Sequence, residues 1–138
     1  MSPRLVPELI CSDLARSRDF YCDVLGFGVR YARPAERFVY LERDGAELMI
    51  EEPVDRARLH PRVELTHPYG RGVNFEIDVD DVDVLHAALQ ASGQDLFLPL
   101  EERWYERETD VVGVRQFAVQ DPDGYLLRFS QAIGTRPA

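Results

Sequence analysis

A single arginine stands in an otherwise apolar stretch near the C-terminus: Arg128 lies in the sequence LLRF. The Asp-Pro-Asp-Gly before it is strong turn chemistry, because Pro122 sets φ at the second turn position and Gly124 accepts the left-handed conformation. We expect Arg128 to pair with Glu51, near the end of AELMIEE, or with Glu76, within GVNFEIDV.

A carboxylate beside a guanidinium supports more than one kind of chemistry. Glu51 or Glu76 could act as a general base while Arg128 stabilises an anionic intermediate. The same arrangement could equally be a structural ion pair. Nucleophilic catalysis finds no support, because no Ser or Cys stands with a His and an acid in a convincing context, and no glycine loop is suited to phosphate.

Large aromatic and acidic side chains point to a second kind of chemistry, the recognition of flat, positively charged molecules. Phe38, Tyr40 and Trp104 suit stacking on heterocycles, and carboxylates attract amines. The acidic candidates are Glu8, Glu51, Glu76, Glu101 and Glu102. For Trp104 a packing role, at a dimer seam or under a loop edge, is an equal alternative, and the surrounding LEERWYERETD could be a solvated, mobile connector.

The composition limits the partners. The 138 residues suit one domain with its own core. With 25 acidic against 16 basic residues the formal net charge is −9, which argues against nucleic acid, whose phosphates need clustered Lys and Arg. A cationic small molecule suits this balance better. No stretch resembles a signal peptide or approaches the ~20 apolar residues of a membrane span, so we expect a cytoplasmic protein.

The elements that position these residues repeat once along the chain. The first half predicts a strand in LVPELIC, a helix capped by Ser12 or Asp13, and strands in FGVRYA, RFVYLER and AELMIEE. The second half predicts a strand in GVNFEIDV, a helix capped by Asp80 or Asp81, and strands in DLFLPL, VRQFAVQ and YLLRFSQ. Each half is thus a strand, a helix and three strands, an internal duplication.

The modules have approximate boundaries. Module one covers about 4–53 and module two about 72–132 of the single domain. The linker between them, about 54–71, is rich in Pro and Arg and has no clear periodicity. We expect a long loop there, with at most one short element, that acts as a hinge or lid.

Alternation of side chains along the strands separates a core face from a second face. Toward the helices we expect Leu5, Leu9, Cys11, Val39, Leu41, Leu48, Ile50, Val73, Phe75, Ile77, Val79, Phe117, Val119, Leu127 and Phe129. The other face then carries Glu8, Phe38, Tyr40, Met49, Glu51, Asn74, Glu76, Gln116 and Arg128. A solvated face is one interpretation, but large aromatics interleaved with opposed charges favour the lining of a cleft.

In the order and spacing of PELICSDLARSRDFYCDVLGF, DGAELMIEE and FAVQDPDGYLLRF, nearly the whole chain resembles the vicinal-oxygen-chelate superfamily. This superfamily includes glyoxalase I, extradiol dioxygenases, fosfomycin-resistance enzymes and bleomycin-resistance proteins. The resemblance implies an α+β fold of two βαβββ modules, whose curved mixed sheets form a cleft. It also implies a homodimer, whose N-terminal strands are either exchanged or not.

In metal-dependent members of this superfamily, four positions supply ligands, and the matching residues here are Val6, Glu51, Asn74 and Arg128. Only Glu51 is a good ligand, because Val6 has no donor atom and Arg128 would place a positive charge beside the cation. We therefore expect no metal and no other cofactor. The histidines are His60, His67 and His86, and a rearranged site of His67 with Glu51 is the alternative. Cys11 and Cys22 match no zinc or redox spacing.

Members without these ligands are typified by the bleomycin-resistance proteins, which the chain resembles at PELICSDL and in its acidic balance. The resemblance implies a metal-independent binding protein of the antibiotic-resistance type that sequesters a cationic or aromatic small molecule. The expected ligand-binding residues are Glu8, Phe38, Tyr40, Met49, Glu51, Asn74, Glu76, Trp104, Gln116 and Arg128, with none catalytic. The alternatives are a lyase or dioxygenase-like enzyme using Glu51 or Glu76 as its base, and a module whose cleft is vestigial or serves a protein partner.

Overall fold

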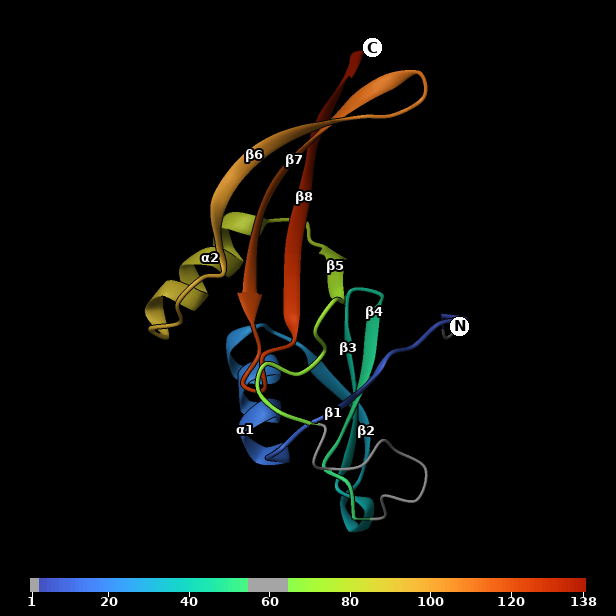
Figure 1. Ribbon diagram of the computed structural model, residues 1–138, viewed down its shortest axis with the longest axis vertical. Helices are drawn as coiled ribbons and strands as arrows, with labels where there is room; N and C mark the ends of the chain where they lie inside the picture. The colour runs from blue at the N-terminus through green and yellow to red at the C-terminus, as the bar shows by residue number, and fades with distance from the viewer. Residues whose placement is uncertain (1–2, 55–64) are drawn as a thin grey trace. The chain divides into compact units, whose positions relative to one another are not determined.

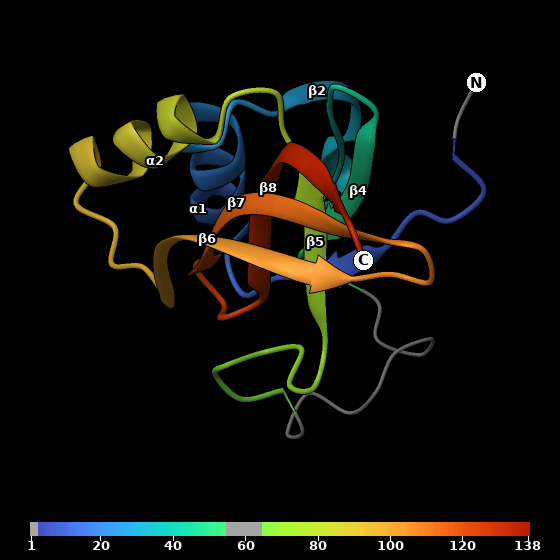
Figure 2. The same ribbon diagram turned by 90° about the horizontal axis from the view of Figure 1, so that it is seen from above.

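The computed structural model describes residues 3–54 and 65–138, which form two four-stranded mixed sheets, each accompanied by a helix (Figures 1 and 2). Two compact units result. Unit 1 contains Met1–Arg71 with Asp121–Tyr125, and unit 2 contains Gly72–Gln120 with Leu126–Ala138. The expected α+β fold of two strand–helix–three-strand modules is confirmed. His60 and most of the expected linker lie outside the described residues.

Unit 1 contains the first sheet, in the order β1-β4-β3-β2. Its strands are β1 (Glu8–Ile10), β2 (Gly28–Arg33), β3 (Phe38–Arg43) and β4 (Ala46–Glu51), with β1 parallel to β4 and the other pairs antiparallel. The helix α1 (Leu14–Asp19) starts at Asp13, whose carboxylate accepts a hydrogen bond from the N–H of Arg16. A π-helical turn, η1 (Phe20–Val24), continues α1. A 3₁₀ turn, η2 (Pro34–Glu36), links β2 to β3.

The core of unit 1 lies on one face of this sheet. Val39, Leu41, Leu48 and Ile50 are buried there, as alternation predicts. Tyr21 and Leu25 of the helical segment cover them and are fully buried themselves. One core expectation is wrong: Leu5 is 84% exposed, because it precedes β1 and so has no partner strand to hold it against the helix. Cys11 is buried and Cys22 is half-buried, and both are free thiols.

The turn Asp121–Tyr125 packs in unit 1 and is held there by two buried carboxylates. Asp121 accepts hydrogen bonds from the hydroxyl of Tyr21 at 2.8 Å and from the N–H groups of Asp123 and Tyr125. Asp123 in turn accepts from the backbone and side chain of Ser12. The two acids of this turn therefore do more than shape the turn. They also attach it to Ser12 and Tyr21 near the N-terminus.

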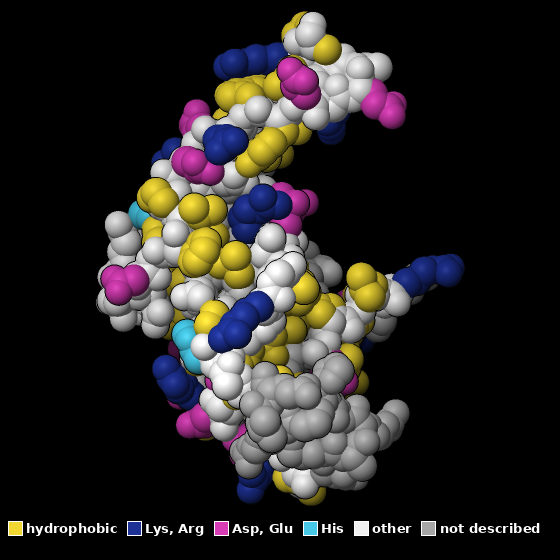
Figure 3. Space-filling view, viewed as in Figure 1, with side chains coloured by type: hydrophobic (Ala, Val, Ile, Leu, Met, Phe, Trp, Pro, Cys, Tyr) yellow, Lys and Arg dark blue, Asp and Glu magenta, His cyan; other side chains and the backbone are white. Residues whose placement is uncertain are grey.

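Unit 2 contains the second sheet, in the order β5-β8-β7-β6. Its strands are β5 (Asn74–Asp78), β6 (Leu98–Glu106), β7 (Asp110–Gln120) and β8 (Leu126–Pro137), with β5 parallel to β8. The helix α2 (Val82–Ala91) packs against β7 and β8. On the upper part of the molecule in Figure 3, hydrophobic side chains lie between charged ones, and Leu98 and Tyr105 of β6 are more than a third exposed.

The last three strands are longer than predicted. The stretch around Trp104, for which a mobile connector was one alternative, is part of β6, which pairs with β7 from Leu98 to Glu106. The ring of Trp104 packs so closely on Gly113 of β7 that a Cβ there would lie 2.6 Å from it. The guanidinium of Arg136 in β8 covers the ring at 3.6 Å. These contacts order a stretch whose many charges suggested mobility, because a stacked tryptophan anchors all three strands.

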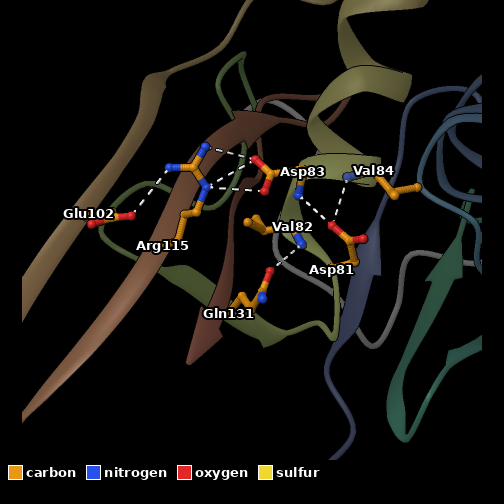
Figure 4. A network of polar contacts seen from close by, with 7 residues as sticks. All are labelled: Asp81, Val82, Asp83, Val84, Glu102, Arg115 and Gln131. Atoms are coloured by element: carbon orange, nitrogen blue, oxygen red, sulfur yellow. Dashed lines mark hydrogen bonds and ion pairs between the residues drawn. The ribbon is translucent and has the colours of Figure 1, made fainter. Parts of the chain in front are cut away.

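Polar contacts fasten α2 to the sheet of unit 2 (Figure 4). The side chain of Asp81 caps the helix by accepting from backbone N–H groups of its first turn. The N–H of Val82 donates to the side-chain oxygen of Gln131 in β8 at 2.9 Å. Arg115 of β7 pairs with Asp83 at 2.9 Å. The expected cap at Asp81 is confirmed. The expectation that Val73 is a core residue is wrong: its side chain is 53% exposed, because it precedes β5 and so lies outside the helix-covered face.

Among the described residues, no helix has the length and apolar character needed to cross a membrane.

The titration of Asp121 should make the stability of the protein depend on pH. Burial raises the pKa of Asp121 to about 6, against the hydrogen bonds that favour its ionised form. The folded state holds this proton more tightly than the unfolded state does. The contribution of Asp121 to the free energy of unfolding is therefore fully present below about pH 4 and is lost as pH rises through about 6. We expect the free energy of unfolding to fall across this window by on the order of 2–3 kcal/mol.

Asp121→Asn keeps an acceptor oxygen but has no titrating proton, so it should flatten this part of the pH profile in urea unfolding. Asp19→Asn, on the exposed surface of α1, is the matched control and should keep the wild-type slope. An unchanged slope in Asp121→Asn would mean that another group is responsible.

Candidate functional site

Unit 1 has a second sheet face, opposite its core, that combines rings and carboxyl groups. The strand register places Tyr31 opposite Tyr40, Phe38 opposite Glu51, and Met49 between Tyr40 and Glu8. We call this surface the aromatic–carboxyl face. Its members are Glu8, Tyr31, Arg33, Phe38, Tyr40, Met49 and Glu51.

The rings on this face form a stack. The ring centre of Tyr31 lies 6.1 Å from that of Phe38 and 5.0 Å from that of Tyr40, with interplanar angles of 30° and 26°. Phe38 and Tyr40 are 3% and 6% exposed, whereas Tyr31 is 45% exposed. Arg33 covers the ring of Phe38 at 3.8 Å. The aromatic surface that solvent reaches is therefore chiefly that of Tyr31.

Sequence reasoning missed Tyr31 and Arg33. The register between β2 and β3 shifts between Val29 and Tyr31, which breaks the alternation that would have assigned their face. The pattern of GVRYAR alternates polar and apolar residues weakly, so no sequence signal marked the shift. The available signal was the aromatic ring of Tyr31 itself, one strand away from Tyr40.

Tyr40 is held in place through its hydroxyl, which donates to Glu47 at 2.7 Å. Arg30 forms an ion pair with the same carboxylate and also lies over the ring of Tyr40, 5.2 Å from its centre. The hydrogen bond from Tyr40 and the contact with Arg30 lower the pKa of Glu47. Glu47 therefore stays ionised and holds the ring of Tyr40 in place through its hydroxyl.

Glu8 and Glu51 form a carboxyl pair beside the rings. Partial burial raises the pKa of Glu51, and the hydrogen bond and charge of Glu8 raise it further, while Arg33 acts weakly in the opposite direction. Two carboxyl groups in contact favour sharing one proton over carrying two negative charges. A positively charged group placed between them would replace that proton.

Unit 2 has a face of different character, which we call the amide–guanidinium face: Asn74, Glu76, Glu101, Tyr105, Gln116 and Arg128. Arg128 pairs with Glu76, its neighbour across the strands, at 3.4 Å, which confirms one of the two expected partners. Gln116 is 3% exposed and donates from its amide to Glu101 at 3.2 Å and to the Tyr105 hydroxyl at 2.7 Å. Asn74 is exposed at the start of β5.

A hollow of about 520 Å³ adjoins this face. Its lining includes Glu76 and Ser130, together with apolar side chains of Val112 and Val114. Ser130 lies directly opposite Gln116, and Glu76 directly opposite Arg128. The hollow therefore touches the immediate neighbours of both polar groups.

Trp104 and Glu102 lie apart from this group. Successive residues of β6 alternate in direction, so Trp104 lies on the opposite face from Tyr105, which contacts Gln116. Glu102 lies 3.7 Å from Arg115, which also pairs with the helix residue Asp83 (Figure 4). Their roles in ligand binding stay predictions, as does the cleft expected from the two sheets.

The residues at the expected metal positions do not fit a divalent cation. Val6 offers no donor, and the guanidinium of Arg128 already pairs with Glu76. Within residues 3–54 and 65–138, no three His, Cys, Asp or Glu side chains come together as a ligand group.

Comparisons with known proteins find similar chains over nearly the whole length of this one. A bleomycin resistance protein of Geobacillus stearothermophilus is 27% identical over 137 residues, which cover 93% of this chain and 96% of that protein. The crystal structure of TioX from Micromonospora sp. ML1 has a TM-score of 0.70 at 23% identity and covers 95% of this chain and 100% of that one. A superfamily member from Vibrio splendidus 12B01 is 42% identical, with a TM-score of 0.43, over 94% of this chain and 98% of its own.

The family model matches residues 5–129, which cover most of both modules and the turn that ends in Gly124. The two four-stranded mixed sheets, each built from a strand, a helix and three strands, agree with that match. The chain belongs to the Glyoxalase/Bleomycin resistance protein/Dioxygenase superfamily.

Proposed function

We propose that the protein is a metal-independent binding protein that sequesters a small molecule carrying both a positive charge and a flat aromatic group. The observation that carries this proposal is the aromatic–carboxyl face, where the half-exposed Tyr31 tops a ring stack beside the carboxyl pair of Glu8 and Glu51. The distant similarity to bleomycin resistance proteins supports it and makes bleomycin the first ligand to test. We also propose that the protein acts as a cytoplasmic homodimer without nucleic-acid partners.

The binding mode follows from what each group offers. A flat ring can stack on Tyr31, while an amine of the same ligand replaces the proton between Glu8 and Glu51. The face of Phe38 is occupied by Arg33, so a ligand ring reaches it only by displacing that guanidinium. Phe38 and Tyr40 then support the ligand chiefly by holding Tyr31. On the amide–guanidinium face, Asn74, Glu76, Gln116 and Arg128 provide hydrogen-bonding groups.

An enzyme is the second candidate, and the raised pKa of Glu51 favours it. A carboxylate that binds its proton more tightly is a stronger general base. Incubation of the ligand with the protein, followed by mass spectrometry, separates the two functions. An unchanged ligand supports sequestration. Conversion that Glu51→Gln abolishes while ligand binding persists would support the enzyme instead.

Calorimetric titration of the metal-free protein with bleomycin tests the leading proposal. We expect saturable binding of about one ligand per chain, unchanged by added zinc or nickel. Tyr31→Ala should weaken binding by about 1–3 kcal/mol, the usual scale of a lost stacking contact. Phe97→Ala removes an exposed ring outside the face and should bind like the wild type. Equal affinity in Tyr31→Ala would remove this ring from the site.

Binding of a cationic ligand should release a proton from the carboxyl pair. Because the pKa of Glu51 is raised, part of the pair stays protonated above the usual range for glutamate, and the bound cation favours the ionised form. Affinity should therefore rise with pH through the titration of Glu51. The proton count is measured by calorimetry at one pH in buffers of different ionisation enthalpy.

Glu8→Gln removes one charge from the pair and should reduce this proton release, whereas Glu106→Gln on β6 should not. Proton release that is unchanged in Glu8→Gln would assign it to other groups. Absence of release in the wild type would mean that the ligand amine does not contact the pair.

A further inference from the structure

Two buried polar atoms on the amide–guanidinium face lack a hydrogen-bond partner among the described residues. They are the side-chain oxygen Oε1 of Gln116 and the Nε of Arg128. Arg128 lies opposite Ala118 across β7 and β8, so Gln116 is its diagonal neighbour on the same face. A buried donor or acceptor without a partner loses its hydrogen bonds to water and gains none in the protein, so such atoms in a folded protein call for an explanation.

The orientation of the Gln116 amide is fixed by its other contacts. Its NH₂ group donates to Glu101 at 3.2 Å and to the Tyr105 hydroxyl at 2.7 Å. A flipped amide would place its oxygen against the carboxylate of Glu101, which has only acceptors to offer. The oxygen of Gln116 therefore points elsewhere and requires a donor.

The Arg128 side chain offers the complementary group. Its Nη2 is used by Glu76 at 3.4 Å, while its Nε–H remains and requires an acceptor. The guanidinium charge is balanced by Glu76, and Glu101 adds a second carboxylate near Gln116. This surplus of negative charge disfavours an anionic ligand group, which could not donate to Gln116 in any case.

We propose that Gln116 and Arg128 form a subsite for a carboxamide or lactam group of the ligand. The ligand carbonyl accepts from Nε–H of Arg128, and the ligand N–H donates to Oε1 of Gln116. The adjoining hollow of about 520 Å³ has the volume to hold the ring or chain that carries the amide. This subsite rests on the proposed small-molecule binding and specifies one chemical group of the ligand.

The chemistry predicts strong discrimination between close analogues. A site whose buried polar groups are completed by a ligand rejects an analogue that leaves one of them unpaired. Benzamide offers both the carbonyl and the N–H, acetophenone has the carbonyl alone, and benzoate has acceptors with a negative charge. The order of affinity should be benzamide first, with acetophenone and benzoate each weaker by about tenfold or more.

The test uses the full chain labelled with ¹⁵N, because arginine Nε–H signals are observed directly by NMR. Addition of benzamide should shift the Arg128 signal and slow its exchange with water. No shift up to the solubility limit of benzamide would overturn the proposal. Equal affinity for benzamide and acetophenone would overturn it as well.

Two variants test the two hydrogen bonds separately. Gln116→Met keeps the side-chain size but removes the acceptor, so benzamide should bind about tenfold more weakly while acetophenone binds as before. Arg128→Lys keeps the charge but removes Nε–H, so both probes should weaken. Gln90→Met, on the exposed surface of α2, is the matched control and should leave both affinities unchanged. Wild-type affinity for benzamide in both site variants would overturn the subsite.

A bleomycin titration of Gln116→Met separates failure of the subsite from failure of the proposed function. Wild-type bleomycin affinity in Gln116→Met, together with no preference of the wild-type protein for benzamide over acetophenone, removes the subsite and leaves the binding function in place. Benzamide selectivity without bleomycin binding keeps the subsite and changes the ligand.

Discussion

Alternation of side chains along the strands is the constraint on which both polar faces depend. A slip of one residue would turn the ring stack of unit 1 into its core, and would place the buried Val39 and Ile50 in solvent. Two turns hold the register. Asp44 and Gly45 adopt positive φ between β3 and β4, and the buried acids of Asp121–Tyr125 close β7 on β8. The positions of Tyr40 and Gln116 therefore depend on turns that take no part in binding.

The two faces handle charge differently. On the aromatic–carboxyl face, burial and the neighbouring Glu8 raise the pKa of Glu51, and the cation Arg33 is placed over a ring. On the amide–guanidinium face, Arg128 and Glu76 neutralise one another, which leaves directed hydrogen bonds as the main means of recognition. One face is suited to selecting charge and flatness, and the other to selecting the pattern of donors and acceptors.

The sequence predicted the architecture well, because period-two alternation and helix capping are local signals. The strand and helix order, the cap at Asp81 and the pair of Arg128 with Glu76 were all accessible in this way. Features that depend on contacts across strands were not. The bulge beside Tyr31 and the packing of Trp104 on Gly113 arise from the neighbouring strand, so the sequence of one strand alone does not predict them. The metal-free state and the ligand contacts remain predictions.

The outermost strands of both sheets are poorly suited to recruiting a further strand. In unit 1 these are the three-residue β1, which follows Pro7, and β2, which contains a bulge and the charges of Arg30 and Arg33. In unit 2 they are the short β5 and the highly charged β6. Short, bulged or charged edges discourage open-ended strand pairing between molecules. Self-association of this protein is therefore expected to use side-chain surfaces rather than strand edges, which disfavours fibrils built by edge-to-edge strand pairing.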